Sequence, residues 1–361
     1  MHAQTQSERI YGLDALRALS MLLGTFIHAP VILHMKDAGI IAGIQVVDIP
    51  DPPLWVLLAL GWIHYWRMPV FFLLAGFFAG LMIKKYGWNY LARDRFNKIF
   101  LGFLLFFALY NLVFSGSFSR LYHLWFLYYL VLIYLCFFAL SFLKKIFLKS
   151  VRFDHSSIGY TLIALIFFSN LGSVYPFYTR VFPEYFGDFS LVSFAHYFAW
   201  FLLGTFLYSS RTLIEIISTS TIKRKFGYAS ICLFVVQAML LIFGNPEDSL
   251  HQALYVIGFA LTAIFTTLYV LALAYSAKLK INSKISFFVE ISYSYYLWHL
   301  FPAIYIGAMM LSFGFGALEI VIINLLMIPF FTLLMHFLFV KFTPLSWIIQ
   351  GYKKSDFKPF G

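Results

Sequence analysis

Apolar segments of about 20 residues recur from one end of this chain to the other, and they constrain its fold more than any other feature. Such a segment is long enough to cross a bilayer as a helix, and only helices and closed barrels satisfy every backbone hydrogen bond there. The sequence is 62% hydrophobic and only 11% charged, whereas soluble domains carry about 25% charged residues. We therefore expect an all-α, polytopic membrane protein whose residues 1–361 form a single transmembrane domain.

Charged and proline-containing loops divide the apolar segments into ten predicted membrane spans. Lysine and arginine gather in alternate loops, so the positive-inside rule places those loops and both termini in the cytoplasm. These basic loops lie around residues 84–98, 144–152, 211–225 and 278–284. Residues 54–83 exceed one straight span, so we predict that they break at Arg67-Met68-Pro69, into an outer amphipathic segment and a span from 69 to 83. The other predicted spans are 15–35, 99–114, 122–142, 157–171, 191–208, 227–243, 253–276, 286–310 and 317–340.

Charge and cysteine usage exclude several other classes of protein. The net charge of +11 does not indicate a nucleic-acid-binding protein, because the basic residues lie in short loops between apolar segments. Cys136 and Cys232 both lie in apolar runs, without metal-ligand spacing or a disulfide framework. We expect no cleavable signal peptide, because the first apolar run contains Arg17 and His28 and no small-residue cleavage site follows it.

The first apolar run carries ionisable residues along one helical face. Arg17 and His28 are eleven residues apart, which at about 100° per residue returns to within about 20° of the same direction. Asp14, Met21 and Gly24 complete this stripe at three- and four-residue spacing. Ionisable groups in hydrocarbon usually face a protein interior or a watery cavity. We expect the stripe to line a path from the cytoplasmic surface towards the membrane centre, with His28 at its inner end.

His28 and His299 lie at matching depths of the first and ninth predicted spans. Two histidines at one depth can share a site. A neutral imidazole there can take a proton from a hydroxyl group or briefly carry an acyl group. Metal binding is the rival use, but it needs a further ligand at that depth and a helical pairing such as His and Glu four residues apart. Neither His28 nor His299 has such a partner four residues away, so we expect no metal.

Further residues are expected to line the outer part of the same cavity. They are His64, Arg67, His123, Trp125 and Tyr296. The indole of Trp125 can support a sugar, or it can belong to an interfacial aromatic belt. For His196 and His336 we expect a plain structural role, in which a neighbouring helix satisfies the imidazole.

The basic loop 84–98 has two interpretations. The positive-inside rule alone explains its charge. It does not explain why Arg95 and Lys98 lie one helical turn apart at the start of the third span, a spacing that can hold a phosphate group. With Arg17, this pair predicts a site for an anionic cytosolic donor such as a coenzyme A thioester.

Five motifs occur in the order that characterises one family of integral membrane enzymes. They are Arg17 followed ten residues later by His28, Phe71-Phe72-Leu73-Leu74-Ala75-Gly76-Phe77, Arg93-Asp94-Arg95-Phe96-Asn97-Lys98, His123-Leu124-Trp125-Phe126-Leu127 and Ser292-Tyr293-Ser294-Tyr295-Tyr296-Leu297-Trp298-His299. Together they resemble the acyltransferase 3 family over nearly the whole chain. Two departures stand out: Ala75 replaces the usual serine, and Lys98 replaces the second arginine of the basic motif.

The resemblance implies a membrane O-acyltransferase of the bacterial inner membrane. It implies that an acyl group from succinyl-CoA or acetyl-CoA crosses between the helices to hydroxyl groups of an extracytoplasmic glycan, foremost a periplasmic glucan. It implies that His28 is catalytic, that Asp14 and Arg17 organise the donor end, and that Arg93, Arg95 and Lys98 bind the donor with Arg17. A homodimer, or association with glucan-synthesis proteins, would fit such a role.

Two other functions are compatible with a polytopic helical bundle. One is a transporter or flippase of a glycan or lipid-linked sugar, for which we would expect inverted repeats and broken helices in corresponding halves. The other is a membrane sensor or scaffold, which would leave the stripe of Arg17 and His28 without a purpose. The identity of the acyl group also stays open. A succinyl group carries a negative charge and would need a cation such as Arg67 near it, whereas an acetyl group would not.

Overall fold

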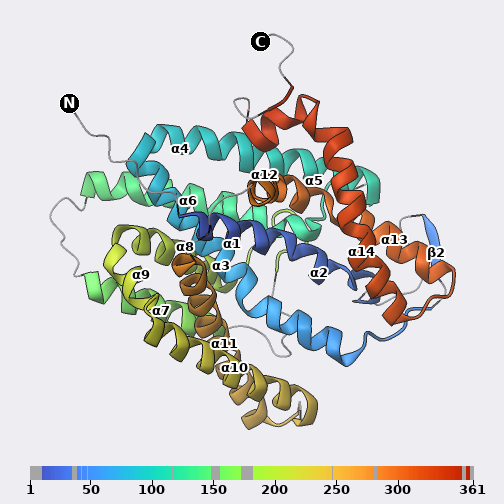
Figure 1. The fold of residues 1–361 in the computed structure, drawn as a ribbon, viewed down its shortest axis with the longest axis horizontal. Helices are drawn as coiled ribbons and strands as arrows, with labels where there is room; N and C mark the ends of the chain where they lie inside the picture. The colour runs from blue at the N-terminus through green and yellow to red at the C-terminus, as the bar shows by residue number, and fades with distance from the viewer. Residues whose placement is uncertain are drawn as a thin grey trace.

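The computed structural model describes residues 10–34, 39–41, 43–46, 48–114, 117–147, 155–171, 182–245, 247–277, 279, 283–351 and 355–357. These residues form a helical bundle (Figure 1). Its α-helices are α1 Tyr11–Leu22, α2 Gly24–His28, α3 Leu54–Tyr86, α4 Trp88–Arg95, α5 Leu101–Phe114, α6 Trp125–Phe147, α7 His155–Leu171, α8 Leu191–Ser209, α9 Arg211–Ile217, α10 Ser220–Phe243, α11 Ser249–Ser276, α12 Ser283–Trp298, α13 Leu300–Ser312 and α14 Ala317–Met335. Shorter helices are the 3₁₀-helices η1 Val31–His34 and η3 Tyr122–Leu124 and the π-helices η2 Phe96–Phe100, η4 His336–Lys341 and η5 Trp347–Gly351.

One small hairpin departs from the expected all-α architecture. Strand β1, Gly39–Ile41, pairs antiparallel with β2, Ile44–Val46, and Ile40 lies opposite Gln45. Gly43 in the connecting turn has φ +80°, a conformation that favours glycine. The hairpin lies at the edge of the bundle beside α13 (Figure 1).

Seven helical stretches of the described chain are long and apolar enough to cross a membrane. They are Leu54–Tyr86, Trp88–Phe114, Tyr122–Leu143, Leu191–Ser209, Ser220–Phe243, Ser249–Ser276 and Ala317–Lys341. Two shorter apolar helices, Ser157–Leu171 and Leu300–Ser312, coincide with parts of further predicted spans. The total of ten spans and the cytoplasmic termini stay predictions, and parts of the predicted loops at 144–152 and 278–284 lie outside the described residues.

The predicted break at Arg67-Met68-Pro69 is wrong, because α3 runs without interruption from Leu54 to Tyr86. Proline removes one hydrogen bond inside a helix, but a membrane helix tolerates this when its neighbours surround the freed groups. Here the residues from Tyr65 to Leu74 are all buried in the bundle. The 33 residues of α3 extend about 50 Å, so the helix is longer than a bilayer core is thick.

Two glycines allow α3 to pack closely against α8, its most extensive helix contact. A Cβ atom at Gly76 would lie 1.8 Å from the Phe201 carbonyl oxygen, and one at Gly204 would lie 1.8 Å from that of Leu73. Small residues are typical of such close helix contacts in membranes. Gly76, which belongs to one of the five sequence motifs, therefore serves the fold.

The basic residues 84–98 form helices rather than the expected loop. Helix α3 ends at Tyr86, Gly87 reverses the chain direction with φ +84°, and α4 begins at Trp88. The π-helix η2 then joins α4 directly to α5. The cations of this stretch therefore lie on helices: two at the end of α3, two in α4 and one in η2.

Two membrane segments that we predicted as continuous are interrupted deep in the bundle. The first is divided at Leu23 between α1 and α2, and the ninth at His299 between α12 and α13. The second interruption has a clear cause: Pro302 lacks the N–H that would bond the carbonyl four residues earlier, and α12 ends at that residue, Trp298. Helices α1 and α12 pack against each other.

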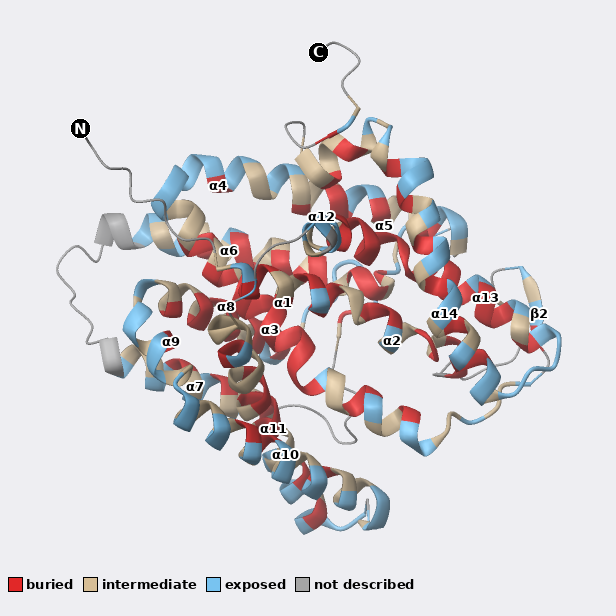
Figure 2. Ribbon diagram, viewed as in Figure 1, coloured by how far each residue is buried: buried red, intermediate tan, exposed pale blue. Residues whose placement is uncertain are grey.

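Buried residues run through the centre of the bundle, along α1, α3 and the inner faces of α5, α8 and α12 (Figure 2). The peripheral helix α10 has few buried residues. The largest fully buried side chains of this core are aromatic, among them Trp200, Tyr110 and Phe72. This core surrounds both interruptions and positions the residues next to them.

Candidate active site

Three histidines from distant parts of the sequence meet where the helices are interrupted. The ring centroids of His28 and His299 lie 5.0 Å apart, those of His123 and His299 lie 5.0 Å apart, and those of His28 and His123 lie 6.0 Å apart. His123 and His299 are buried, whereas His28 is partly buried. The structure thus brings His28 and His299 together and adds His123 to them.

The backbone carbonyl of Tyr296 orients two of these imidazoles. It accepts hydrogen bonds from Nδ1 of His299, at 2.6 Å, and from Nε2 of His123, at 3.1 Å. Because a carbonyl oxygen only accepts, both of those nitrogens carry protons. In the neutral rings, Nε2 of His299 and Nδ1 of His123 are then lone-pair acceptors, and both are buried without a hydrogen-bond partner among the described residues.

The interruption of α12 and α13 makes this arrangement possible. The last carbonyls of a helix lack partners within it, so side chains can bond them. Tyr110 donates to the Leu297 carbonyl at 2.9 Å, beside the bonds to Tyr296. The Tyr296 hydroxyl donates in turn to the His123 carbonyl at 2.8 Å. Helix α12 is thereby fixed against α5 and η3.

The interruption of α1 and α2 provides the opposite wall. Arg67, buried in α3, donates from Nε to the Ser20 carbonyl at 2.8 Å, at the end of α1. A Cβ atom at Gly24 would lie 3.0 Å from Nε2 of His299 and 3.3 Å from an Nη atom of Arg67. The glycine therefore lets the backbone of α2 approach both groups. Thr25 bonds the Tyr295 hydroxyl and holds α2 to α12.

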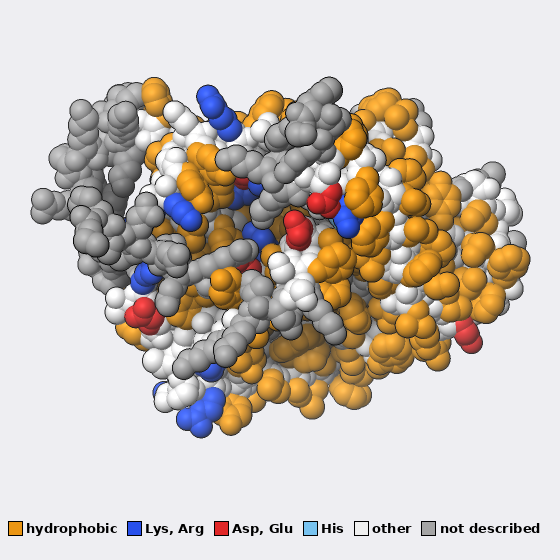
Figure 3. Space-filling view, turned by 45° about the horizontal axis from the view of Figure 1, so that its top comes forward, with side chains coloured by type: hydrophobic (Ala, Val, Ile, Leu, Met, Phe, Trp, Pro, Cys, Tyr) orange, Lys and Arg blue, Asp and Glu red, His pale blue; other side chains and the backbone are white. Residues whose placement is uncertain are grey.

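A separate cavity of about 630 Å³ opens beside the charged helix α4. Its walls include Asp14, Arg17, Arg95 and Lys98, four of the residues predicted at the donor end. Basic and acidic side chains gather on this face of the molecule, whereas much of the neighbouring surface is apolar (Figure 3). The structure therefore places the predicted donor cations, except Arg93, around one cavity.

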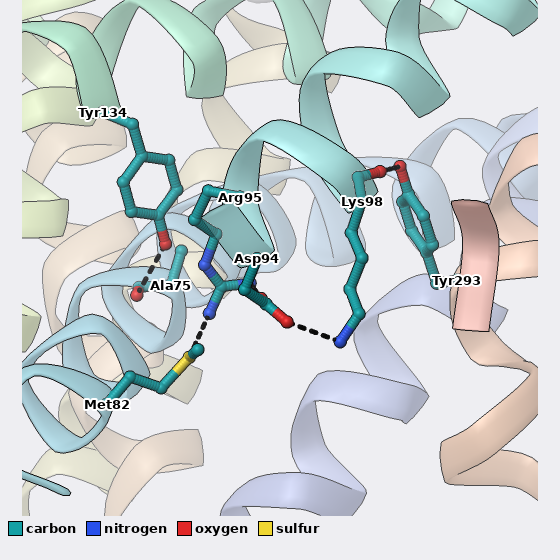
Figure 4. Close-up of polar contacts among 7 residues, drawn as sticks. All are labelled: Ala75, Met82, Asp94, Arg95, Lys98, Tyr134 and Tyr293. Carbon is teal, nitrogen blue, oxygen red and sulfur yellow. Dashed lines mark hydrogen bonds and ion pairs between the residues drawn. The ribbon is translucent and has the colours of Figure 1, made fainter. Parts of the chain in front are cut away.

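Carboxylates accompany each cation in this cavity. Arg17 lies 3.6 Å from Asp14, while Asp94 lies 2.7 Å from Lys98 and 3.6 Å from Arg95 (Figure 4). Cations and carboxylates are thus paired along the walls, and an anionic donor would have to displace carboxylates from the cations it binds. Asp94 was not among the predicted site residues, although its four-residue spacing from Lys98 is that of a helical ion pair.

A side chain of α12 bonds the backbone of the π-helix η2 at Lys98. The Lys98 carbonyl accepts a hydrogen bond of 2.6 Å from the Tyr293 hydroxyl (Figure 4). A Cβ atom at Gly102 would lie 2.6 Å from that hydroxyl oxygen, so the glycine leaves room for the bond. π-Helical turns occur frequently at functional sites. Tyr293 therefore connects the charged cavity to α12, the helix that carries the Tyr296 carbonyl.

The histidines are separated from this cavity by aromatic side chains. Met21, Phe71 and Phe126 belong to the cavity walls, but His28 does not. The rings of Phe71 and Phe126 lie 4.3 Å apart, and Phe126 also contacts the Tyr296 ring at 5.7 Å. The predicted stripe is therefore divided: its first three members line the cavity, and Gly24 and His28 face the histidine cluster. The path that we expected along the whole stripe stays a prediction.

The remaining predicted residues lie elsewhere. Arg93 is exposed and lines a different groove of about 720 Å³ between η2 and α6. His64 is exposed on α3, within electrostatic range of His28. Trp125 stacks on Phe182 at 4.1 Å, as a packing residue would.

His196 and His336 have the structural environments that we expected. Ser169 lies 3.0 Å from Nδ1 of His196, and Trp200 donates to its Nε2 at 3.1 Å. Nδ1 of His336 lies 2.8 Å from the Ser294 hydroxyl. Among the described residues, no group of three or more His, Cys, Asp or Glu side chains is arranged to hold a metal ion.

The family follows from comparison of the whole sequence with known families. Residues 10–342 match the acyltransferase domain of the acyltransferase 3 family. The chain belongs to the acyltransferase 3 family. No solved structure shows a significant match to this acyltransferase 3 chain.

Curated relatives match this acyltransferase 3 protein over a short region. Proteins named glucans biosynthesis protein C, from Escherichia coli O1:K1 / APEC and from Escherichia coli O157:H7 (strain EC4115 / EHEC), are each 34% identical to it over 80 residues. The match covers 22% of this chain and 19% of each relative. The chain therefore spans about a fifth of the length of these curated relatives.

Proposed function

We propose that this membrane acyltransferase moves a succinyl or acetyl group from a cytosolic acyl-CoA to hydroxyl groups of an extracytoplasmic glycan, foremost a periplasmic glucan. The bacterial inner membrane is the corresponding location. The glycan class comes from the name of the curated relatives, glucans biosynthesis protein C. A homodimer, or association with glucan-synthesis proteins, belongs to the same proposal.

The observation that carries the proposal is the histidine cluster. Three imidazoles lie within 5.0 to 6.0 Å of one another in the middle of the bundle, and two of them carry unbonded acceptor nitrogens. Such nitrogens can accept a proton from a hydroxyl nucleophile, which typically contributes about 10² to 10⁴ in rate. A purely structural histidine, such as His196, has partners on both nitrogens.

On the donor side, the cavity of Arg17, Arg95 and Lys98 would bind the phosphates of coenzyme A. Guanidinium and ammonium groups are the usual phosphate ligands, and Arg17 and Lys98 are partly exposed to the cavity. Asp14 would orient Arg17, as its ion pair of 3.6 Å suggests. The acyl end would point inward, towards Met21, Phe71 and Phe126.

On the acceptor side, His28 would act as general base, with His123, His299, Arg67 and Tyr296 around it. The hydroxyl oxygen of the acceptor forms a bond to the acyl carbon, and the thioester C–S bond breaks. The hydroxyl proton passes to His28 and then to the departing coenzyme A thiolate, which leaves as the thiol. For the acyl group to reach His28, Phe71 and Phe126 must move apart.

The test is mass spectrometry of envelope glycans from cells that contain or lack the protein. We expect an acyl group per modified sugar only in cells with the protein, and the added mass distinguishes succinyl from acetyl. His28→Ala should abolish the modification while membrane insertion and expression persist. His251→Ala, in the first turn of α11, is a matched control because His251 is also a buried histidine. Wild-type modification by His28→Ala would overturn the proposal.

Transport without acyl chemistry is a second candidate, favoured by one observation. Two adjacent helices, α1 and α12, are interrupted deep in the bundle, and discontinuous helices often form substrate sites in transporters. Purified protein in vesicles separates the two functions. A transporter would move the glycan unmodified and ignore acyl-CoA, whereas the acyltransferase would release free coenzyme A.

A further inference from the structure

Arg67 is a buried cation whose role the fold does not explain. Its side chain lies in the interior of α3 with the residue only 7% exposed. Its only hydrogen bond within the described residues runs from Nε to the Ser20 carbonyl. Arginine has five N–H donors in a planar fork, so this single bond anchors the guanidinium and leaves its terminal nitrogens for another acceptor.

Within the described chain, no carboxylate forms an ion pair with Arg67. The titratable side chains near it are histidines and tyrosines, notably His28, His299 and Tyr296, none of which supplies a permanent negative charge. An uncompensated charge inside a membrane bundle is expensive and is usually functional. The cations of the donor cavity, by contrast, all have carboxylate neighbours.

The terminal nitrogens of Arg67 converge with an imidazole acceptor. Nε2 of His299 and one Nη atom of Arg67 lie within 3.3 Å of the same point beside Gly24. The His28 ring lies 5.0 Å from that of His299. A cation with unused donors therefore lies next to His299, whose ring contacts the proposed base His28. An anion that forms in this space would receive hydrogen bonds from Arg67.

We infer that Arg67 is a further catalytic residue, which binds the negatively charged oxygen formed on the acyl carbonyl during transfer. This inference rests on the proposed function. When the acceptor hydroxyl attacks, its proton moves to His28 and the carbonyl electrons move onto the carbonyl oxygen. Arg67 donates to that oxygen until the C–S bond breaks and the carbonyl forms again. Preorganised donors in a low-dielectric site stabilise such a charge strongly.

A carboxylate on the acyl chain is another anion that Arg67 could bind, and the experiment separates the two. A carboxylate-binding arginine would matter for succinyl transfer and be dispensable for acetyl transfer. An arginine that binds the carbonyl oxygen would matter equally for both, because every acyl group has that oxygen. We argue for the carbonyl oxygen because Arg67 lies beside the histidine cluster, where the acyl carbonyl would react. The far end of an acyl chain would lie away from that cluster.

The first measurement is steady-state transfer by purified, reconstituted Arg67→Gln, with both succinyl-CoA and acetyl-CoA as donors. We expect kcat to fall by about 10² to 10³ for every donor that the wild type uses, as for removal of an oxyanion donor. The KM for acyl-CoA should stay within about twofold, because coenzyme A binds in the other cavity. Arg67→Lys should recover part of kcat, since it keeps the charge without the fork.

Chemical rescue provides a readout that a merely structural arginine would not change. Guanidinium ion at low concentration should raise the kcat of Arg67→Ala at least tenfold and leave wild type and His28→Ala unaffected. Arg224→Ala is the matched control, because Arg224 is exposed on α10 and its Nε likewise donates to a backbone carbonyl, that of Ser220. It should retain wild-type kcat.

Several outcomes would overturn the inference. They are a kcat within about twofold of wild type in Arg67→Gln, a defect confined to succinyl-CoA, and a defect in KM alone. If Arg67→Gln does not fold, the kcat of Arg67→Lys and the guanidinium rescue of Arg67→Ala test the inference instead. Failure of wild type to transfer any acyl group would instead overturn the proposed function, so the two failures are distinguishable.

Discussion

Nδ1 of His299 donates a hydrogen bond of 2.6 Å to the carbonyl oxygen of Tyr296, three residues earlier in the chain. This bond determines which nitrogen of the ring carries the proton, because the carbonyl can only accept. The other nitrogen, Nε2, is consequently a lone-pair acceptor that faces Arg67 and Gly24. The next prediction tests whether this free nitrogen assists the transfer whose general base we assign to His28.

His299→Asn and His299→Gln should differ from each other. The asparagine amide can take the place of Nδ1 and keep the bond to Tyr296, but it removes the Nε2 acceptor. The glutamine amide reaches the position of Nε2 and gives up the bond to Tyr296. If Nε2 serves catalysis, His299→Asn should fold normally and lose about 10² or more in kcat, the scale of a lost acid–base group.

Transfer kinetics and thermal unfolding of the two purified variants check this prediction. His299→Gln should retain more kcat than His299→Asn and unfold at a lower temperature, because it leaves the Tyr296 carbonyl with one bond fewer. The reverse order in kcat would show that only the bond to Tyr296 matters.

Gly24→Ala should weaken catalysis without harming the fold. The new Cβ would lie 3.0 Å from Nε2 of His299 and 3.3 Å from an Nη atom of Arg67, so both groups must move by a few tenths of an ångström. Small displacements of reacting groups can cost about 10² in rate. We expect kcat to fall at least tenfold, measured by acyl transfer at saturating donor.

Gly159→Ala is the matched control for that substitution. Its Cβ would lie 3.2 Å from the Phe206 ring, a similar crowding at a contact between α7 and α8 that is remote from the histidines. Wild-type kcat in both variants would contradict the close approach that we assign to Gly24.

Asp94→Asn should strengthen donor binding. Asp94 contacts Lys98 at 2.7 Å and Arg95 at 3.6 Å, and removing its charge leaves both cations to the phosphates of the donor. Partly exposed ion pairs contribute up to about 1 kcal/mol, so we expect the KM for acyl-CoA to fall about threefold to fivefold. The gain should shrink in high salt, because exposed charges are then screened.

Lys98→Gln is the companion variant, and its KM should rise. Donor titrations at low and high ionic strength measure both effects. A higher KM in Asp94→Asn would instead mean that Asp94 holds the two cations in their binding geometry.

Phe71→Ala should open the aromatic barrier between the cavity and the histidines. Its ring contacts Phe126 at 4.3 Å, and its loss would let water and longer acyl chains pass. We expect acyl-CoA hydrolysis without a glycan acceptor to increase severalfold, as release of free thiol would show. The truncation should also destabilise the protein, by about 3 to 5 kcal/mol.

Phe137→Ala, on the far part of α6, separates these two effects. Phe137 is also a buried core residue, so its truncation should destabilise the protein without raising hydrolysis. Equal hydrolysis in both variants would indicate general loosening instead of an opened barrier.

Gly204→Ala should destabilise the bundle itself. Its Cβ would meet the Leu73 carbonyl oxygen at 1.8 Å, and neither backbone can give way without separating α3 from α8. Overpacking typically costs about 1 to 3 kcal/mol, and a backbone clash belongs at the upper end. Thermal unfolding in detergent should show a lowered Tm, whereas an unchanged Tm would contradict this packing.

Much of the candidate site was visible in the sequence because its signals are local. Apolar runs predict membrane helices wherever they occur, and the one-turn spacing of Arg95 and Lys98 predicted a shared binding face. Pro302 illustrates the limit of local reasoning: it interrupts a helix at His299, whereas Pro69 leaves α3 intact. The same residue type has different effects at the two positions, although both prolines are buried in the bundle.

The sequence by itself determined that this chain is a helical membrane protein, that it resembles acyltransferases, and that His28 and His299 lie at similar depth. Only the tertiary structure decided that His123 joins them, that the Tyr296 carbonyl sets the tautomers of His123 and His299, and that Phe71 and Phe126 lie between the histidines and the charged cavity. Depth along a helix follows from the number of residues. Distance across a bundle follows from how helices remote in sequence pack, and no local pattern encodes that packing.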